Sequence, residues 1–228
     1  MDNSMHNRDD TGGWDPAFKD IQDMNFPWRS ALPLARQSRH VKGEQLKLGK
    51  DLLFLDHGRV RLAHQSPEGT EKILWYIRKG CIFGEALFFD ATLDENVCIC
   101  AATSCLVYAF SPASVRQISR DQPELLLNLL QSMARKVKIL TSQASSLSLD
   151  SVLERLCKFL AQRLVPDSDP LTARVGITRH ELASLLGVHR VSLYRVLRQQ
   201  EQRGLFGPIT GDTMTILRPQ DFYRLAGV

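Results

Sequence analysis

The sequence predicts an α+β protein made of short strands, one long helix, and a helix-turn-helix with a small hairpin beside it. Residues 40–110 contain short apolar runs broken by Gly, Pro and Asp. From Pro123 onward, apolar residues recur at the alternating four- and three-residue spacing of a helix. Residues 178–198 indicate two short helices joined at a glycine, which is the arrangement of DNA-binding helix-turn-helix units.

The composition is that of an ordinary globular protein. Its 228 residues suffice for one large or two small domains, and 43% of them are hydrophobic. The net charge of +4 permits nucleic-acid binding without demanding it. The N-terminal sequence lacks the apolar region of a signal peptide, and no apolar run approaches the roughly 20 residues of a membrane helix. We therefore expect a cytoplasmic protein with no membrane partner.

The first half of the chain is predicted to be a loose segment followed by a strand-rich unit. Residues 1–30 are expected to be loosely ordered, with Trp14, Phe18 and Ile21 on a short amphipathic turn. Residues 31–122 have the pattern of a sandwich or barrel of short strands. The strands are predicted within 52–62 on both sides of Gly58, and at 73–77, 97–101 and 106–110, with a turn at 66–69.

Residues 123–148 are predicted to form one long helix, after a helical stretch that begins at Ser111-Pro112. Its apolar positions have the heptad spacing of a coiled-coil seam. They are Leu126, Leu130, Met133, Val137, Leu140, Ala144 and Leu147. This stripe predicts a homodimer, and the alternative is packing onto the strands of the same chain. Residues 145–150 are expected to interrupt the helix as a hinge, because Ser and Asp side chains compete for backbone hydrogen bonds.

Residues 149–228 are predicted to hold the helix-turn-helix between a leading helix and a hairpin. Ser151 and Glu154 have the spacing of a capping box at the start of the leading helix. Residues 209–216 indicate two short strands with a Gly-Asp turn. A hairpin in this place is the wing of a winged helix-turn-helix.

Within the helix-turn-helix, Thr178 and Glu181 form a second capping box, and Gly187 permits the backbone angles of the turn. The apolar side chains of both helices share one face at 3.6-residue spacing. The positions left exposed are the candidate DNA-contacting residues. They are Thr178, Arg179, His180, His189, Arg190, Val191, Ser192, Tyr194, Arg195 and Arg198. The alternative is an ordinary helical hairpin whose arginines are merely solvated.

This order of units, together with two motifs, resembles the Crp–Fnr family of transcription regulators. The motifs are Gly80-Cys-Ile-Phe-Gly84-Glu85 and Ile177-Thr-Arg-His-Glu-Leu-Ala with Gly187. The resemblance covers about residues 40–206, and the segments that begin at Gly69 and Gly187 look most like the reductive dehalogenation regulators. It implies a β-roll (a double-stranded β-helix, cupin-like), a dimerisation helix and an effector pocket between them. It also implies a palindromic double-stranded DNA site and contact with RNA polymerase.

The resemblance places the effector pocket at Gly84 and Glu85, the pair that holds the ribose in cyclic-nucleotide-binding members. The Arg-Ser pair that holds the phosphate in those members falls near Glu95-Asn96 here, and an acidic side chain repels phosphate. We therefore expect an unidentified small-molecule effector that is not a cyclic nucleotide, and no cofactor. The candidate effector-binding residues are Trp75, Tyr76, Phe83, Gly84, Glu85, Lys136 and Leu140.

Several of these candidates have plainer interpretations. Glu85 also suits a turn residue that accepts hydrogen bonds from nearby amides. Lys136 and Lys138 suit solvated charges on the flank of a helix, and the aromatic residues suit the core of the roll.

The resemblance also implies how the second helix of the helix-turn-helix reads DNA. The family's arginine at position 195 contacts guanine, so Arg195 is the expected base reader. Most members carry Glu at the position of Val191, and that Glu accepts a hydrogen bond from cytosine. Valine has no acceptor but packs on the thymine methyl, which predicts an A·T pair at this place in the half-site.

Four cysteines lie in the strand-rich unit, at Cys81, Cys98, Cys100 and Cys105. Their spacing matches no common zinc or iron–sulfur pattern, so we expect small buried hydrophobes and no metal. The alternative is the same DNA-binding role switched by the redox state of these thiols. No catalytic motif appears, which favours a regulator over an enzyme with an auxiliary winged helix.

Overall fold

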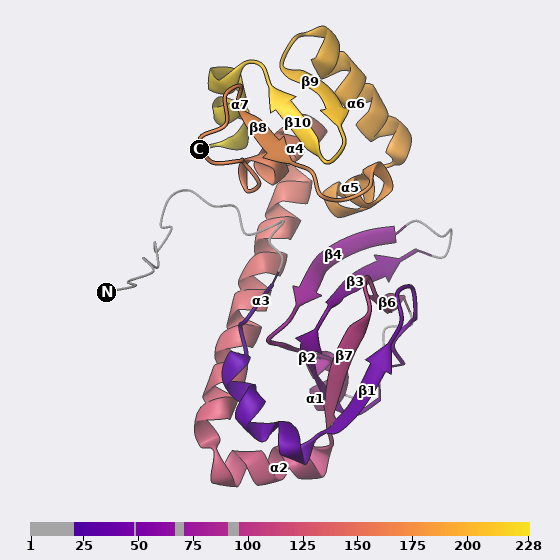
Figure 1. Ribbon diagram of the computed structural model, residues 1–228, viewed down its shortest axis with the longest axis vertical. Helices are drawn as coiled ribbons and strands as arrows, with labels where there is room; N and C mark the ends of the chain where they lie inside the picture. Colours follow the sequence, from indigo (N-terminus) through magenta and orange to yellow (C-terminus); the bar gives the residue numbers. More distant parts are fainter. Residues whose placement is uncertain (1–20, 48, 67–70, 91–95) are drawn as a thin grey trace, which may run out of the picture.

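The computed structural model describes residues 21–47, 49–66, 71–90 and 96–228. A strand-rich lobe lies beside the long helix α3, and a smaller lobe lies at the end of that helix (Figure 1). The elements are η2 (Phe26–Leu34), β1 (Arg36–His40), β2 (Leu52–His57), β3 (Arg59–Gln65), β4 (Glu71–Arg78), β5 (Cys81–Phe83), α1 (Glu85–Asp90), β6 (Val97–Ala101), β7 (Cys105–Phe110), α2 (Pro112–Asp121), α3 (Pro123–Leu149), α4 (Val152–Ala161), β8 (Thr172–Arg174), α5 (Arg179–Leu186), α6 (Arg190–Gln202), β9 (Phe206–Thr210), β10 (Thr213–Ile216) and α7 (Pro219–Ala226). Within the described residues, no helix is both long and apolar enough to cross a membrane.

Two antiparallel sheets make up the strand-rich lobe, one in the order β1-β7-β2-β5 and one in the order β4-β3-β6. The chain passes from β2 to β3 at Gly58, where φ is +93° and a Cβ would lie 2.3 Å from the carbonyl oxygen of Ser104. The predicted α+β fold with a β-roll, a long helix and a winged helix-turn-helix is confirmed. Strands β1 and β5 lie outside the predicted set, because β1 is a polar edge strand and β5 has only three residues.

Residues 21–30 differ from the expected loose segment. Ile21 is buried, and Trp28 is fully buried with its indole N–H donating to the carbonyl of Leu125 at 3.1 Å. Burial of one large aromatic side chain stabilises an ordered segment even where the neighbouring residues are polar. The prediction of a loosely ordered 1–30 is therefore wrong for its last ten residues. Trp14, Phe18 and residues 67–69 of the predicted turn lie outside the described part of the chain.

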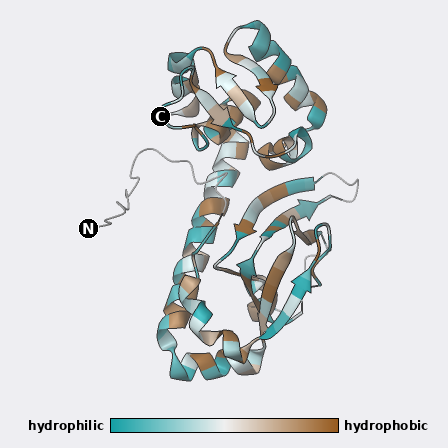
Figure 2. Cartoon of the chain, viewed as in Figure 1, coloured by the Kyte–Doolittle hydropathy of each residue, from teal (hydrophilic) through white to brown (hydrophobic). Residues whose placement is uncertain are grey.

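Helix α3 carries two parallel stripes. One stripe is buried against the chain's own lobe, and its members are Leu125, Leu129, Ser132, Lys136, Ile139, Gln143 and Ser146. The predicted heptad stripe lies one residue further along, and Leu130 and Val137 on it are 61% and 62% exposed. Figure 2 shows apolar residues recurring along both the strands and α3. Packing onto the same chain therefore uses the first stripe, and much of the second is left at the surface.

The serine-rich end of α3 does not interrupt the helix as predicted. Residues 145–149 are helical, and extended angles begin at Asp150, with φ −93° and ψ 141°. The Ser148 hydroxyl donates to the carbonyl of Ala144 at 3.0 Å, so it bonds to the preceding turn instead of ending the helix. The predicted hinge is wrong for the serines, and the break lies at Asp150.

The smaller lobe has the predicted helix order and wing. Both capping boxes are present, and in the second the Thr178 hydroxyl accepts from the Glu181 amide at 3.2 Å. Gly187 ends α5 with φ +64°, and a Cβ there would lie 2.8 Å from the Leu147 side chain of α3. The hairpin β9–β10 turns at Gly211. The short strand β8, which pairs with β10, and the helix α7 lie outside the predicted set.

Candidate effector pocket and DNA-binding surface

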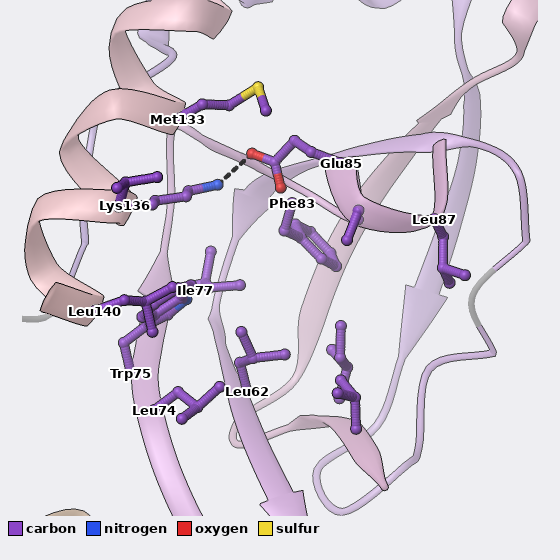
Figure 3. A pocket seen from close by; sticks show the side chains of 15 residues that line it. Leu62, Leu74, Trp75, Ile77, Phe83, Glu85, Leu87, Met133, Lys136 and Leu140 are labelled. Atoms are coloured by element: carbon purple, nitrogen blue, oxygen red, sulfur yellow. Dashed lines mark hydrogen bonds and ion pairs between the residues drawn. The ribbon is translucent and has the colours of Figure 1, made fainter. Parts of the chain in front are cut away.

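A cavity of about 430 Å³ lies between the β-roll and α3 (Figure 3). Its lining residues come from β3, β4, β5, β6, α1 and one side of α3. They are Leu62, Leu74, Trp75, Ile77, Phe83, Gly84, Glu85, Ala86, Leu87, Val97, Ile99, Met133, Lys136, Val137 and Leu140. The described lining is apolar except at one place, where Glu85 and Lys136 meet. Such a cavity is large enough for a small organic ligand.

Lys136 is the charged residue around which the polar end of the cavity is built. It is only 7% exposed, and its ammonium donates to the Ile82 carbonyl at 2.7 Å and to the Glu85 carboxylate. Figure 3 shows the two side chains pointing toward each other across the cavity wall. The interpretation as a solvated flank charge is therefore wrong for Lys136, and the exposed side chain of Lys138 fits it. Glu85 is the first residue of α1 and pairs with a cation in place of capping amides.

Six of the seven candidate effector residues line this cavity, and Tyr76 does not. β4 contains a bulge: Leu62 pairs with Trp75, whereas the next residue of β3 pairs with Ile73, so that Leu74 is extra and faces the cavity together with Trp75. Beyond Trp75 the strand alternates regularly, so Tyr76 faces the opposite way. The placement of Tyr76 in the pocket is therefore wrong, because adjacent residues of a regular strand face opposite sides.

The opposite face of β4 binds the helix-turn-helix. The Tyr76 hydroxyl donates to Glu181 at 2.9 Å, and the ammonium of Lys72 donates to the carbonyl of Leu185 near the end of α5. The Ser184 hydroxyl accepts from the Ile73 amide at 3.2 Å and donates to the Glu71 carbonyl at 2.6 Å. β4 is an edge strand, so this hydroxyl replaces the peptide group of a missing neighbour. One strand thus separates the cavity from the helix-turn-helix.

Two cations, the half-buried Lys72 and the buried Arg155, lie close together at this junction. Burial and, next to it, the positive charge of Arg155 together lower the pKa of Lys72 to about 8. Arg155 is 7% exposed, and its Nε has no hydrogen-bond partner in the described structure. Hydrogen bonds and apolar packing therefore stabilise the junction, whereas the repulsion between Lys72 and Arg155 destabilises it.

Helix α6 presents a concave surface to solvent. Its lining residues are Val191, Tyr194, Arg195, Arg198, Gln199 and Gln202. Val191 and Tyr194 are 60% and 48% exposed, and Arg179 of α5 lies over the Tyr194 ring, 5.4 Å from its centroid. The other predicted DNA-contacting residues, Thr178, His180, His189 and Arg190, are also exposed, and Ser192 is half-buried. An exposed, arginine-rich helix face has the form that enters a DNA groove.

Residues 43–122 match the family of cyclic nucleotide-binding domains, and residues 154–225 match the family of Crp-like helix-turn-helix domains. The chain belongs to the Crp–Fnr family of transcription regulators. It is 27% identical over 171 residues to the cAMP-activated global transcriptional regulator CRP of Haemophilus influenzae, across 72% of this chain and 76% of that protein. It is 28% identical over 172 residues to the cAMP-activated regulator Vfr of Pseudomonas aeruginosa, across 72% and 79%. These relatives are regulators and not enzymes, as the sequence predicts.

Solved structures share the fold of this Crp–Fnr protein. A cysteine-to-serine variant of CprK in complex with OCPA superposes with a TM-score of 0.73 at 16% identity, covering 88% of this chain and 94% of the CprK chain. A CooA mutant from Carboxydothermus hydrogenoformans also gives a TM-score of 0.73, at 18% identity, covering 93% and 99%. At this level of identity the likeness concerns the fold.

The cysteines of this Crp–Fnr chain fall into two groups. Cys81, Cys105 and Cys157 are buried in apolar clusters, where burial raises the pKa of Cys81 to about 11 and that of Cys157 to about 12. Cys98 and Cys100 are only half-buried, and their sulfur atoms lie 3.1 Å apart on one face of β6. The interpretation as buried core residues is therefore wrong for this pair. No cluster of three or more metal-ligating side chains occurs in the described residues.

The docking of α5 on β4 gives a prediction for Ser184→Ala. Removing the hydroxyl leaves the Ile73 amide and the Glu71 carbonyl without their partner at a buried position. The free energy of unfolding should fall by about 1–3 kcal/mol, measured by chemical denaturation, and the Ile73 amide should exchange faster. Ser119→Ala is the control, because that exposed hydroxyl donates only to the Arg116 carbonyl of its own helix. Equal losses for the two variants would contradict this docking.

Proposed function

We propose that the protein is a homodimeric regulator that binds a two-fold symmetric DNA site and is switched by a small organic anion. The observation that carries this proposal is a shared surface. Met133, Val137 and Leu140 line the cavity and also belong to the heptad stripe of α3. A ligand in the cavity would therefore contact the same α3 side chains that we assign to contact the helix of a second copy. RNA polymerase is the expected further partner.

The exposed stripe of α3 supports the dimer. Leu130 and Val137 are more than half exposed, and Leu140 and Leu147 are 39% and 41% exposed. Apolar side chains at heptad spacing are covered when a second such helix packs against them. The buried stripe already accounts for packing on the same chain, so the second stripe supports a partner outside it.

The chemistry of the cavity supports an apolar effector with one anionic group. The described lining offers a single cation, Lys136, in an otherwise apolar wall. Trp75 supplies an aromatic surface to this wall. An aromatic carboxylate would fill the apolar space and supply an acceptor for the Lys136 ammonium.

A cyclic nucleotide fits this lining poorly. The carboxylate of Glu85, which would hold a ribose, is occupied by Lys136, and breaking a buried ion pair is costly. A cyclic phosphate also needs a cation of its own, and Glu95 stands where the sequence comparison expects one, although Glu95 lies outside the described residues. We therefore propose that cyclic AMP is not the effector of this chain, whereas two of its relatives are named as cAMP-activated.

The dimer is tested with a single charge in the stripe. Leu130→Glu places a carboxylate at a seam position that does not line the cavity, and should give monomers with weakened DNA binding. Gln131→Glu, at the next exposed position, adds the same charge outside the stripe and should leave the dimer intact. Analytical ultracentrifugation decides the matter, and a dimer that persists in Leu130→Glu contradicts the assignment of the seam.

The effector site is tested with phenylacetate, its neutral analogue 2-phenylethanol, and cyclic AMP. Calorimetry on the wild type should show tighter binding of phenylacetate than of 2-phenylethanol, and no binding of cyclic AMP. Lys136→Met should weaken phenylacetate about tenfold or more and leave the alcohol nearly unchanged, because one charge-assisted hydrogen bond contributes about 1.5–3 kcal/mol. Lys138→Met is the matched control on the same helix. Tight cyclic AMP binding without phenylacetate binding would overturn this part of the proposal.

The DNA site is tested by selecting binding sequences from a random pool. Wild type should recover symmetric half-sites with an A·T pair at the position facing Val191, since valine packs on the thymine methyl. Val191→Glu should shift that pair to G·C, by about 1–3 kcal/mol, and leave the guanine read by Arg195 in place. His180→Ala should instead weaken all sequences alike, as the loss of a phosphate contact does. Recovery of the same base pair by wild type and Val191→Glu would refute Val191 as a reader.

A further inference from the structure

Cys98 and Cys100 lie on the outer face of the β-roll, on the other side of β6 from the effector cavity. Their neighbours Val97 and Ile99 line the cavity, so the cysteines between and after them point away from it. The two sulfur atoms are 3.1 Å apart. Both side chains are half-buried and free, whereas the other three cysteines are buried. The proposed effector site does not use this pair.

The strand geometry disfavours a disulfide between these two sulfurs. Alternate residues of a strand have Cα atoms roughly 6.6 Å apart, and their Cβ atoms are about as far apart because the side chains stand side by side. A disulfide needs Cβ atoms about 3.5–4.5 Å apart. Oxidation would therefore bend β6 away from its pairing of Cys98 with Ala63 and of Cys100 with Arg61. A third atom between the sulfurs requires no such bend.

The separation of the sulfurs also indicates which kind of atom fits between them. With metal–thiolate bonds of about 2.3 Å, two sulfurs 3.1 Å apart subtend nearly a right angle at the bridging atom. Linear two-coordinate ions need a wider separation, and tetrahedral zinc needs further ligands, which the described residues around the pair do not supply. Trivalent arsenic is pyramidal, with bond angles close to a right angle, and is satisfied by two protein thiols and one group of its own.

We propose that Cys98 and Cys100 form a dithiol site for a trivalent arsenical. The reaction is a condensation without redox change: an arsenic(III) oxide and two thiols give an arsenic dithiolate and one water. Two sulfur–arsenic bonds form, the arsenic–oxygen bond breaks, and the two thiol protons leave in the water. No external base is needed, because the ligand's own oxygen takes both protons.

The surroundings of the pair are compatible with this chemistry. Burial raises the pKa of Cys98 to about 11, so at neutral pH this thiol itself carries a proton that the ligand's oxygen takes up in the condensation. A bare metal cation would instead have to displace its proton into solvent. Arg61 pairs with Cys100 across the sheet, and its guanidinium lies 3.2 Å from the carboxylate of Glu71. The positive charge next to the pair is therefore already matched by a carboxylate.

Phenylarsine oxide is the probe for this site in the full-length protein. Intact mass spectrometry should show one phenylarsenic group per chain and the loss of two titratable thiols. The adduct should resist a monothiol and be released by a dithiol. Cys98→Ser and Cys100→Ser should each lower the affinity by roughly a hundredfold or more, because the second sulfur–arsenic bond is formed intramolecularly.

Cys105→Ser is the matched control, because that cysteine is buried and its sulfur bonds to the carbonyls of Arg59 and Thr103; this variant should bind the probe like the wild type. Circular dichroism on all three variants establishes that they are folded. Two results would overturn the proposal. One is the absence of a phenylarsenic adduct on the folded wild type. The other is an adduct retained with unchanged affinity in both Cys98→Ser and Cys100→Ser.

Discussion

The bulge in β4 is the constraint on which the arrangement of this regulator depends. A regular strand would send alternate side chains to opposite faces, and only one of Leu74 and Trp75 would reach the cavity. The extra residue at Leu74 turns both of them inward and leaves Ile73 and Tyr76 facing the helix-turn-helix. Ligand contacts and helix-turn-helix contacts are thereby placed on the two sides of one edge strand. The distance between the two sites is the thickness of a single backbone.

Helix α3 holds this bulged strand in place from the other side. Its buried stripe is partly polar, and two of the polar members, Lys136 and Gln143, bond to the backbone of the roll. The amide of Gln143 donates to the carbonyl of Leu74, the extra residue of the bulge, and Lys136 donates to the carbonyl of Ile82. Bulges leave backbone groups without ladder partners, and a buried carbonyl needs a donor. A purely apolar stripe would pack as well but would leave these carbonyls unsatisfied, which explains Lys136 and Gln143 at buried positions.

Sequence reasoning succeeded where local chemistry decides the structure. The capping residues Thr178 and Ser151, the turn glycine Gly187 and the wing are fixed by neighbours within a few residues, and the structure has them as predicted. It failed where a contact between distant segments decides. Which of Trp75 and Tyr76 faces the cavity depends on what packs against each face of β4, and the burial of Lys136 depends on Glu85, which lies far away in the sequence. The serines at the end of α3 were expected to compete with the helix, and they bond to its preceding turn.

The exposed stripe of α3 connects the cavity, the turn of the helix-turn-helix and the proposed dimer seam. Val137 and Leu140 on this stripe line the cavity, and Leu147 at its far end lies against the turn of the helix-turn-helix at Gly187. A ligand shifts an equilibrium only through contacts that differ between two states. A ligand in the proposed effector site would contact both β4 and the stripe, and the helix-turn-helix contacts both. Any movement of β4 relative to α3 therefore changes the ligand contacts and the packing of α5 together. By thermodynamic reciprocity, DNA binding changes the affinity for the ligand by the same factor by which the ligand changes the affinity for DNA.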